Sequence, residues 1–432
     1  MLVSFVRCAN NNAYKFLEVL ILVKTTALRL YGKKDLRIDR FELPEISDDE
    51  ILATVVSDSM CMSSWKLAQE GEEHKKTPSD LVDNPIMIGH EFSGKIVKVG
   101  KNWQNKFSAG EDYVIQPNLA RDDTPFVPGY SYPNIGGDAT YVIIPKEVME
   151  LNCLVTFHGS AYYEGSLCEP LSCVIAAFNA QFHLIPHTYD HKMGIKNNGN
   201  LLLLGGTGPM GLLAIDYAIH ADVKPQTLVV TDLDQDKLDY AKKLYPSDEV
   251  KMVFINVNHL SIAEQKKVLL KAVGNRGYDD IFSMISVSPI VEMAGQLLNP
   301  DGCLNQFAGP VKKDFSANLN FYDVHYNFTH VTGTSGGNAK NEAQAAEMIA
   351  RGKMNVAKVI THVLGLNAAA ETTLNQPEIG GGKKLTYPGK KFDRIELAKV
   401  DPNSELGIIL AKHDGLWSPE AEKWILKTMP NI

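Results

Sequence analysis

The chain has 432 residues, of which 44% are hydrophobic and 22% charged, and its formal net charge is -8. This length exceeds what a single core supports, so we expect two domains, and the ordinary composition excludes a largely disordered protein. The acidic charge argues against a nucleic-acid partner. Six cysteines without the spacing of a disulfide framework favour a reducing compartment, so we expect a cytoplasmic protein.

Residues 1–23 are predicted to be an N-terminal extension. The apolar stretch Phe16–Val23 is interrupted by Glu18, so it makes a poor signal peptide, and it is too short to span a membrane. A strand pattern begins directly after it, at Lys24. We therefore expect the loss of Met1–Leu22 to leave fold and activity unchanged. The alternative is that these residues form an extra edge strand or helix.

The first half of the chain is predicted to consist of short strands and turns. Alternating or β-branched runs are separated by Gly, Pro, Asp and Asn, which is the composition of turns. The expected strands begin at Lys24 and continue at Leu36–Leu43, Glu50–Val56, Phe92–Val99, Glu111–Gln116 and Thr140–Ile144. A helical periodicity follows at Pro170–Phe182.

From Asn200 onward strands alternate with helices, the pattern of βαβ units and a parallel sheet. The expected strands are Leu201–Leu204, Thr227–Asp232, Met252–Val257, Asp280–Ser286, Cys303–Ala308 and Thr329–Gly333. The expected helices are Pro209–Ala221, Gln235–Tyr245, Ser261–Val273 and Pro289–Leu298, the last with Ser288 as N-cap. Six such strands make one doubly wound α/β sheet. After Gly337 we expect a helix at Asn341–Arg351, irregular Gly-rich chain, and a C-terminal helix at Ser418–Thr428.

A glycine-rich motif follows the first of these strands. Gly206-Thr207-Gly208-Pro209-Met210-Gly211 matches G-x-G-x-x-G and opens a helix, whose free N–H groups suit the pyrophosphate of a dinucleotide. Asp232, at the end of the second strand, can accept the ribose hydroxyls and would repel a 2′-phosphate, which favours NAD over NADP. The alternative is that Asp232 only caps its strand. Phe307 and Ala308 are expected to line the nicotinamide end, because ligands lie at the carboxyl ends of such strands.

Three side chains in the first half suit a transition metal. Cys61, His90 and Glu91 offer a thiolate, an imidazole and a carboxylate, the ligand types of an open catalytic zinc site. Taken singly, such a cysteine is more often core filler, and such a His or Glu an ordinary surface or paired residue. Their order changes this interpretation. Cys61, then Gly89-His90-Glu91, then Leu167-Cys168-Glu169-Pro170-Leu171 and then the glycine-rich motif resembles the zinc-containing medium-chain alcohol dehydrogenases, particularly their sorbitol and polyol dehydrogenase branch.

The resemblance extends from about Lys24 to the C-terminus. It implies a GroES-like catalytic domain at 24–180, a Rossmann dinucleotide-binding domain at 181–337, and a C-terminal segment at 338–432 that returns to the catalytic domain. It also implies a homo-oligomer. The stretches most similar to the L-sorbose-1-phosphate reductase type within that branch are Cys61–Ala68, Pro128–Gly137, His325–Gly337 and Gly415–Leu426.

The resemblance also assigns roles to single residues. Cys61, His90 and Glu169 match the zinc ligands of polyol dehydrogenases, and Glu91 matches an acid that is either an alternate ligand or a support for the ligands. Cys168 competes with Glu169, but the Glu-Pro-Leu-Ser frame favours Glu169. Ser63 matches the hydroxyl that passes the substrate's proton outward.

Two departures from the family pattern change what is expected. Lys66 stands where many members carry a His that continues the proton relay, so the relay must end in water or another group. Residues 112–137 contain no cysteine, so the four-cysteine structural zinc site of many relatives is missing. One zinc per chain, at the catalytic site, is therefore expected.

The implied activity is zinc-dependent hydride transfer between NAD(H) and a polyol or ketose. A phosphate on the substrate is favoured by His74, Lys75 and Lys76, which lie between the first two metal ligands and suit a dianion. The resemblance implies that the phosphorylated substrate is a sugar phosphate such as L-sorbose 1-phosphate. Arg121 and the hydroxyls of residues 130–132 are further candidate donors. One alternative is a plain polyol or secondary-alcohol dehydrogenase, in which these lysines form a solvated loop face. The other is a non-catalytic dinucleotide-binding sensor, which would need none of the metal ligands.

Overall fold

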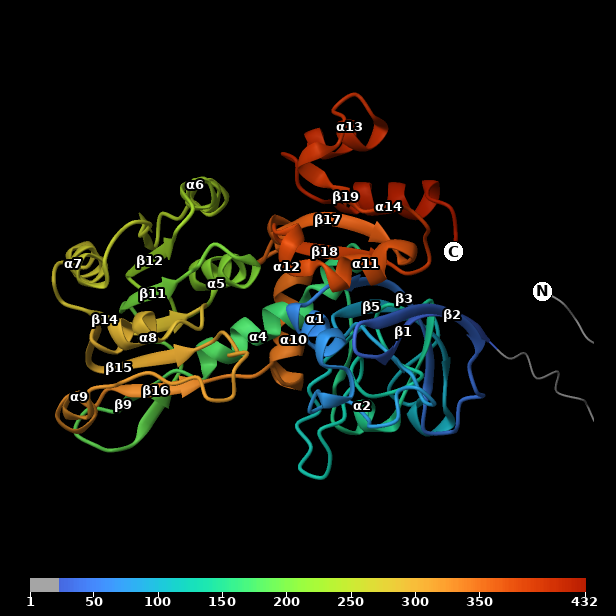
Figure 1. Ribbon diagram of the computed structural model, residues 1–432, viewed down its shortest axis with the longest axis horizontal. Coiled ribbons are helices and arrows are strands. Elements are labelled where there is room, and N and C mark those ends of the chain that lie inside the picture. The colour runs from blue at the N-terminus through green and yellow to red at the C-terminus, as the bar shows by residue number, and fades with distance from the viewer. Residues whose placement is uncertain (1–22) are drawn as a thin grey trace, which may run out of the picture.

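The computed structural model describes residues 23–432, which form two lobes with helix α4 (Cys168–Asn179) between them (Figure 1). One lobe is built on a parallel sheet and the other on a larger, mostly antiparallel sheet. The expectation for Met1–Leu22 falls outside the described residues. Within residues 23–432, the helices are all too short or too polar to cross a membrane.

The parallel sheet has six strands in the order β13-β12-β11-β14-β15-β16. The central strand, β11, is buried along its whole length, because its leucines face covered surfaces on both sides. This order confirms the predicted doubly wound α/β sheet. Successive strands are added on one side of β11 up to β13 and then on its other side from β14 onward. Its strands are β11 (Asn200–Leu204), β12 (Thr227–Asp232), β13 (Lys251–Asn256), β14 (Tyr278–Ser283), β15 (Leu298–Gln306) and β16 (His330–Gly333).

The helices of this lobe are α5 (Pro209–His220), α6 (Gln235–Leu244), α7 (Ile262–Ala272), α8 (Ser288–Gly295) and α9 (Phe321–Tyr326). Ser261 caps α7, since its side chain accepts a hydrogen bond from Glu264 N. The N-cap expected at Ser288 is wrong. Val287 holds that position, and Ser288 Oγ instead donates to the Ser316 carbonyl oxygen at 2.6 Å.

The other lobe contains an eight-stranded sheet, in which β19-β17-β18-β3-β5-β6-β8 follow one path and β7 pairs with β3. A second sheet of three strands has the order β2-β1-β4. The strands of this lobe in the first half are β1 (Lys24–Gly32), β2 (Asp35–Glu42), β3 (Ile51–Ser59), β4 (Ile86–Met87), β5 (Phe92–Val99), β6 (Asp112–Ile115), β7 (Tyr141–Ile144) and β8 (Leu154–Thr156). The hairpin of β9 (Phe182–Leu184) and β10 (His191–Met193) lies beside the parallel sheet, where Leu184 N donates to Asp301 Oδ1 (Figure 1). The helices of this half, besides α4, are α1 (Met62–Glu70), α2 (Lys146–Glu150) and α3 (Tyr162–Ser166).

The C-terminal part contains strands where irregular chain was expected. β17 (Ile360–Gly365) and β18 (Lys383–Tyr387) pair with each other, and β18 continues the sheet by pairing with β3. The expectation was wrong because Lys383 and Lys384 make β18 look polar, whereas all five of its residues are buried. Both ammonium groups have partners inside the protein, which offsets the cost of burial. The other elements are α10 (Ala339–Ala350), α11 (Ala369–Leu374), α12 (Gln376–Ile379), β19 (Ile395–Glu396), α13 (Glu405–Lys412) and α14 (Pro419–Thr428).

Candidate active site

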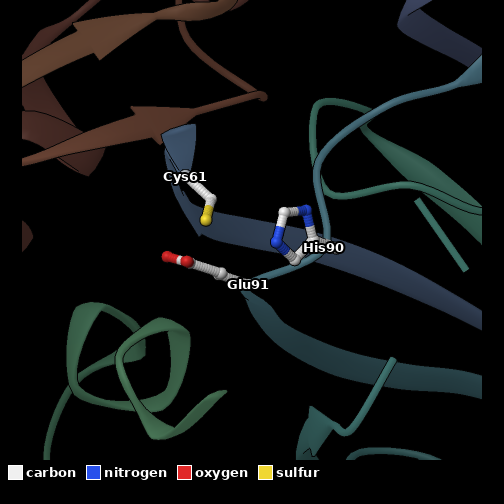
Figure 2. A group of neighbouring side chains, drawn as sticks. All are labelled: Cys61, His90 and Glu91. Atoms are coloured by element: carbon white, nitrogen blue, oxygen red, sulfur yellow. The ribbon is translucent and has the colours of Figure 1, made fainter. Parts of the chain in front are cut away.

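Cys61, His90 and Glu91 come together in the strand-rich lobe. One ligand atom from each lies within 4.8 Å of the others, and Figure 2 shows the three side chains turned toward a common space. Strand pairing explains this proximity. β3 and β5 are antiparallel neighbours, with Asp58 opposite Phe92, so the chain leaving β3 toward Cys61 passes the chain entering β5 from His90 and Glu91.

The turn that carries His90 depends on glycine. Gly89 has a φ of 91°, and a Cβ there would lie 2.7 Å from Asp138 N and 2.9 Å from Asp58 Oδ2. The Asp58 carboxylate also accepts a hydrogen bond from Glu91 N at 3.2 Å. Burial, followed by the nearby Asp138 carboxylate, raises the pKa of Asp58 well above its usual range. A larger residue at position 89 would therefore displace both candidate ligands.

Burial affects the protonation of both the imidazole and the thiol. Burial lowers the pKa of His90 well below its ordinary value, so the ring is neutral, which is the form that binds metals. Burial and the Glu91 carboxylate raise the pKa of Cys61 to about 12. A thiolate at this position therefore needs a cation beside it, and a divalent metal ion supplies one. The donor set fits zinc.

Two hydroxyls at the start of α1 contact these donors. Ser63 Oγ lies 2.9 Å from Cys61 Sγ and 3.3 Å from His90 Nε2. Ser64 Oγ lies 3.5 Å from His90 Nδ1, the other ring nitrogen. The two nitrogens of His90 therefore face different hydroxyls, which holds the ring in one orientation.

Glu91 has a strong partner of its own. Lys383 Nζ, from β18, donates to both carboxylate oxygens, at 2.6 Å to Oε1, and both side chains are almost fully buried. Burial alone would lower the pKa of Lys383, but the charges of Glu91 and Cys61 outweigh it and raise that pKa. The ammonium thus stays charged and holds the Glu91 carboxylate. The sequence pattern did not indicate Lys383.

Glu169 reaches the same region from the first turn of α4. It is buried, and burial together with the nearby Glu91 carboxylate raises the pKa of Glu169 to about 7. Its carboxylate lies outside the 4.8 Å group. Cys168, the sequence-level competitor, points elsewhere, into the hydrophobic core, with Sγ 3.6 Å from the Glu164 carbonyl oxygen. Cys173, one helical turn after Glu169, donates to Glu169 Oε1 at 3.4 Å, and this i, i+4 spacing was the signal that would have found it.

The cationic residues after α1 differ in their surroundings. Lys75 is exposed, whereas Lys76 is half-buried with Nζ 4.6 Å from the centre of the Tyr130 ring. Burial, and then Lys75, lower the pKa of Lys76, while the Glu169 carboxylate is among the groups that raise it. His74 stacks on the same Tyr130 ring, with ring centres 6.0 Å apart. Lys76 is therefore the cation directed toward the candidate metal ligands.

Tyr130 itself is a site residue that the sequence named only as a possible phosphate donor. Its hydroxyl donates to Ser63 Oγ at 2.8 Å and lies 3.0 Å from His90 Nε2. Burial raises the pKa of Tyr130 well above its ordinary value, so the phenol keeps its proton. Arg121 is not part of this arrangement, because it pairs with Asp123 and Glu147 at the surface.

The glycine-rich turn follows β11 of the parallel sheet and leads into α5. Gly211 packs so closely that a Cβ would lie 2.3 Å from Gly206 O, and Gly208 is the N-cap of α5. The Asp232 carboxylate, at the end of β12, accepts hydrogen bonds from the hydroxyl and, at 3.3 Å, the N–H of Thr207. It therefore lies against the turn where a ribose would follow the pyrophosphate.

The side chain of Lys66 joins the two lobes. Lys66 Nζ, on α1, donates to Gly309 O at 3.2 Å. Gly309 follows Phe307 and Ala308, whose N–H groups both donate to Ser283 O at the end of β14, at 3.1 and 3.0 Å. The loop expected at the nicotinamide end thus contacts the helix that carries Ser63.

Comparison with known proteins is consistent with this geometry. A family model for zinc-binding dehydrogenases matches residues 209–351, and one for the alcohol dehydrogenase GroES-like domain matches residues 47–152. The chain is 55% identical over 409 residues to L-sorbose 1-phosphate reductase of Klebsiella pneumoniae, covering 94% of this chain and 98% of that protein. It is 44% identical over 416 residues to mannitol-1-phosphate 5-dehydrogenase of Aliivibrio fischeri, covering 94% and 98%.

Solved structures share the fold at low identity. 2R,3R-butanediol dehydrogenase from Bacillus subtilis superposes with a TM-score of 0.67 at 21% identity, covering 84% of this chain and 99% of that one. A zinc-binding dehydrogenase from Sinorhizobium meliloti bound to NADP gives a TM-score of 0.68 at 20% identity, covering 85% and 100%.

Proposed function

Because the chain belongs to the zinc-binding alcohol dehydrogenases with a GroES-like domain, we propose that it transfers hydride between NAD(H) and a ketose 1-phosphate such as L-sorbose 1-phosphate. The chain is a zinc-dependent polyol or sugar-phosphate oxidoreductase that uses a nicotinamide cofactor. The observation that carries the phosphate proposal is the half-buried ammonium of Lys76, which lies over the ring of Tyr130, whose hydroxyl is 3.0 Å from His90 Nε2. The two relatives named for sugar phosphates support it.

We assign Cys61, His90 and Glu169 as the residues that hold zinc. Glu91 is not assigned as a ligand, because Lys383 donates hydrogen bonds to both oxygens of its carboxylate. When bound, zinc supplies Lewis-acid chemistry that lowers the pKa of an alcohol. Ser63 Oγ lies between the thiol and the imidazole, so it is the atom that takes the proton of the substrate hydroxyl while it releases its own proton outward to water. Phe307 and Ala308 would line the nicotinamide end of the cofactor, because ligands lie at the carboxyl ends of such strands.

Lys76 is suited to a dianionic group on the substrate. An ammonium removed from bulk water interacts with an anion more strongly than an exposed one does. Lys75 and His74, next to it in the chain, add positive charge or donors at the rim. A phosphate on the carbon beside a ketone would lie within reach of this cluster while the oxygen that reacts lies at the metal ligands.

The test compares kcat/KM for L-sorbose 1-phosphate with kcat/KM for L-sorbose. A charge-assisted hydrogen bond contributes about 1.5–3 kcal/mol, so the wild type should prefer the phosphate at least about tenfold. Lys76→Met should remove most of this preference, and Lys75→Met, at the exposed neighbour, should remove much less. Equal use of both substrates would support a plain polyol dehydrogenase, and inactivity on every alcohol and ketose would support the sensor.

We propose that NAD is preferred over NADP because of Asp232. Its carboxylate lies against the Thr207 turn, where it would accept ribose hydroxyls and repel a 2′-phosphate. Asp232→Ser should narrow the ratio of kcat/KM for NAD over NADP by at least about tenfold, roughly 1.4 kcal/mol. Asp234→Ser is the matched control, because serine retains the N-cap of α6 while the same charge is lost two residues away. A wild-type enzyme that prefers NADPH would show that Asp232 does not contact the ribose.

One zinc per chain and a reducing compartment belong to the same proposal. Residues 112–137 contain no cysteine that would form a structural zinc site. The five cysteines within residues 23–432 are all free thiols, which supports the cytoplasm.

We propose that the chain forms a homo-oligomer through the edge of its parallel sheet. Within the described residues, β16 pairs only with β15, so its outer edge offers free backbone groups that a second copy related by a two-fold axis can pair with. Apolar side chains surround this edge, with Phe321 76%, Tyr326 61% and Val331 50% exposed. Sedimentation equilibrium should find a dimer or larger species, and Val331→Lys should shift it toward monomer with unchanged circular dichroism. A monomeric wild type would overturn this proposal.

A further inference from the structure

Tyr130 occupies a position between two parts of the site. It lies in the chain between β6 and β7, within the segment that has no cysteine, and its side chain is buried. Its hydroxyl reaches Ser63 and His90, from two other segments of the lobe. Its ring contacts the segment that contains Lys76. A single side chain therefore joins the proton-accepting hydroxyl to the candidate phosphate-binding cation.

The hydroxyl end controls the orientation of Ser63. A serine hydroxyl has one proton and two lone pairs. Ser63 directs its proton to Cys61 Sγ at 2.9 Å, and Tyr130 donates to one of its lone pairs at 2.8 Å. The remaining lone pair is the one available to a substrate hydroxyl. Without the phenol, Ser63 Oγ would keep only Cys61 and His90 as partners, so its rotamer would be less restricted.

The ring end controls the position of Lys76. The ammonium lies 4.6 Å from the ring centre, the geometry of a cation–π contact. The neighbouring backbone is fixed as well, because Ser131 Oγ donates to Lys76 O at 2.6 Å. His74 stacks against the same ring at an interplanar angle of 13°. The aromatic surface thus orders a segment that would otherwise be a solvated loop.

We propose that Tyr130 is a positioning residue with two separable roles, in which the hydroxyl orients Ser63 Oγ for proton transfer and the ring holds the Lys76 ammonium for the substrate's phosphate. The second role rests on the proposed function, whereas the first applies to any alcohol or ketone substrate. The two roles belong to different atoms of one side chain. Two substitutions therefore separate them.

Tyr130→Phe removes the hydroxyl and retains the ring. It should lower kcat about tenfold for both L-sorbose 1-phosphate and L-sorbose, the size of a lost hydrogen bond, while the ratio of their kcat/KM values stays unchanged. Tyr130→Leu removes both features. It should lower kcat similarly and also reduce the preference for the phosphate by roughly threefold to thirtyfold, the range of cation–π contacts.

Binding measurements supply a readout that does not depend on turnover. Inorganic phosphate titrated into chelator-treated protein by calorimetry should bind wild type and Tyr130→Phe equally and Tyr130→Leu more weakly. Tyr113→Phe is the matched control for the loss of a buried phenol, because the Tyr113 hydroxyl donates to Thr54 O at 3.0 Å in the same lobe. It should change neither kcat nor phosphate binding, although it lowers the melting temperature.

The outcomes distinguish this inference from the proposed function. Wild-type kcat in Tyr130→Phe would overturn the role of the hydroxyl. An unchanged phosphate preference and phosphate affinity in Tyr130→Leu would overturn the role of the ring. If the wild type uses both substrates equally, the proposed substrate class fails, while kcat of Tyr130→Phe on L-sorbose still decides the role of the hydroxyl.

Discussion

Cys61→Ala is expected to abolish turnover and metal binding while leaving NADH binding largely intact. Loss of a partner that merely supports a metal ligand typically costs about 10–100-fold, so loss of a ligand itself should cost more. The proposed cofactor contacts lie in the other lobe, on the turn after β11, and do not involve the thiol. Purified wild type should contain about one zinc per chain by mass spectrometry of metals, and the variant should contain nearly none.

Cys168→Ala is the matched control for this experiment. Its thiol lies in the hydrophobic core close in sequence to Glu169, so the variant should lose some stability and keep its metal. NADH affinity, measured by fluorescence, should be similar in wild type and both variants. Full turnover by Cys61→Ala, or by a zinc-free wild-type sample, would contradict the assigned metal site.

The conformation of the glycine-rich turn was predictable because its determinants are close together in the sequence. A buried strand, the three glycines of the G-x-G-x-x-G motif and a helix start all lie within Asn200–Gly211, and the backbone needs of the motif are set within those residues. The parallel sheet followed for the same reason, since each strand and helix carries its own periodicity. The observed ends of the elements differ from the predicted ends by a few residues. For β14 the prediction was Asp280–Ser286 and the structure has Tyr278–Ser283, because the local sequence pattern does not define where strand pairing ends.

The parts that were missed depend on contacts between distant residues. Lys383 lies 292 positions from Glu91, and no property of the sequence around it indicates an ion pair. The same burial made β18 unrecognisable as a strand, because its lysines are polar in sequence and inside the protein in the fold. Tyr130 lies 67 positions from Ser63, and its role follows only once the loop is placed. Cys173 was within reach, since it follows Glu169 by one helical turn.

Lys383→Met is expected to destabilise the metal-free protein by about 3–5 kcal/mol, because it leaves a buried carboxylate without its cation. The Glu91 side chain is 1% exposed and that of Lys383 5% exposed, so water cannot replace the ammonium. Methionine has a similar length and is apolar, so the effect reports the lost charge rather than a cavity. The measurement is the midpoint of urea unfolding after chelator treatment, followed by tryptophan fluorescence.

Two comparisons separate the ion pair from general damage to β18. Glu91→Gln/Lys383→Met removes both charges and should recover most of the loss, because replacing both members of a buried pair is often nearly neutral. Zinc should also reduce the loss in Lys383→Met, since the metal ion supplies positive charge beside the Glu91 carboxylate that the ammonium otherwise holds. A loss below about 1 kcal/mol in the metal-free single variant, or an equal loss in the double variant, would mean that the pair does not hold Glu91 in place.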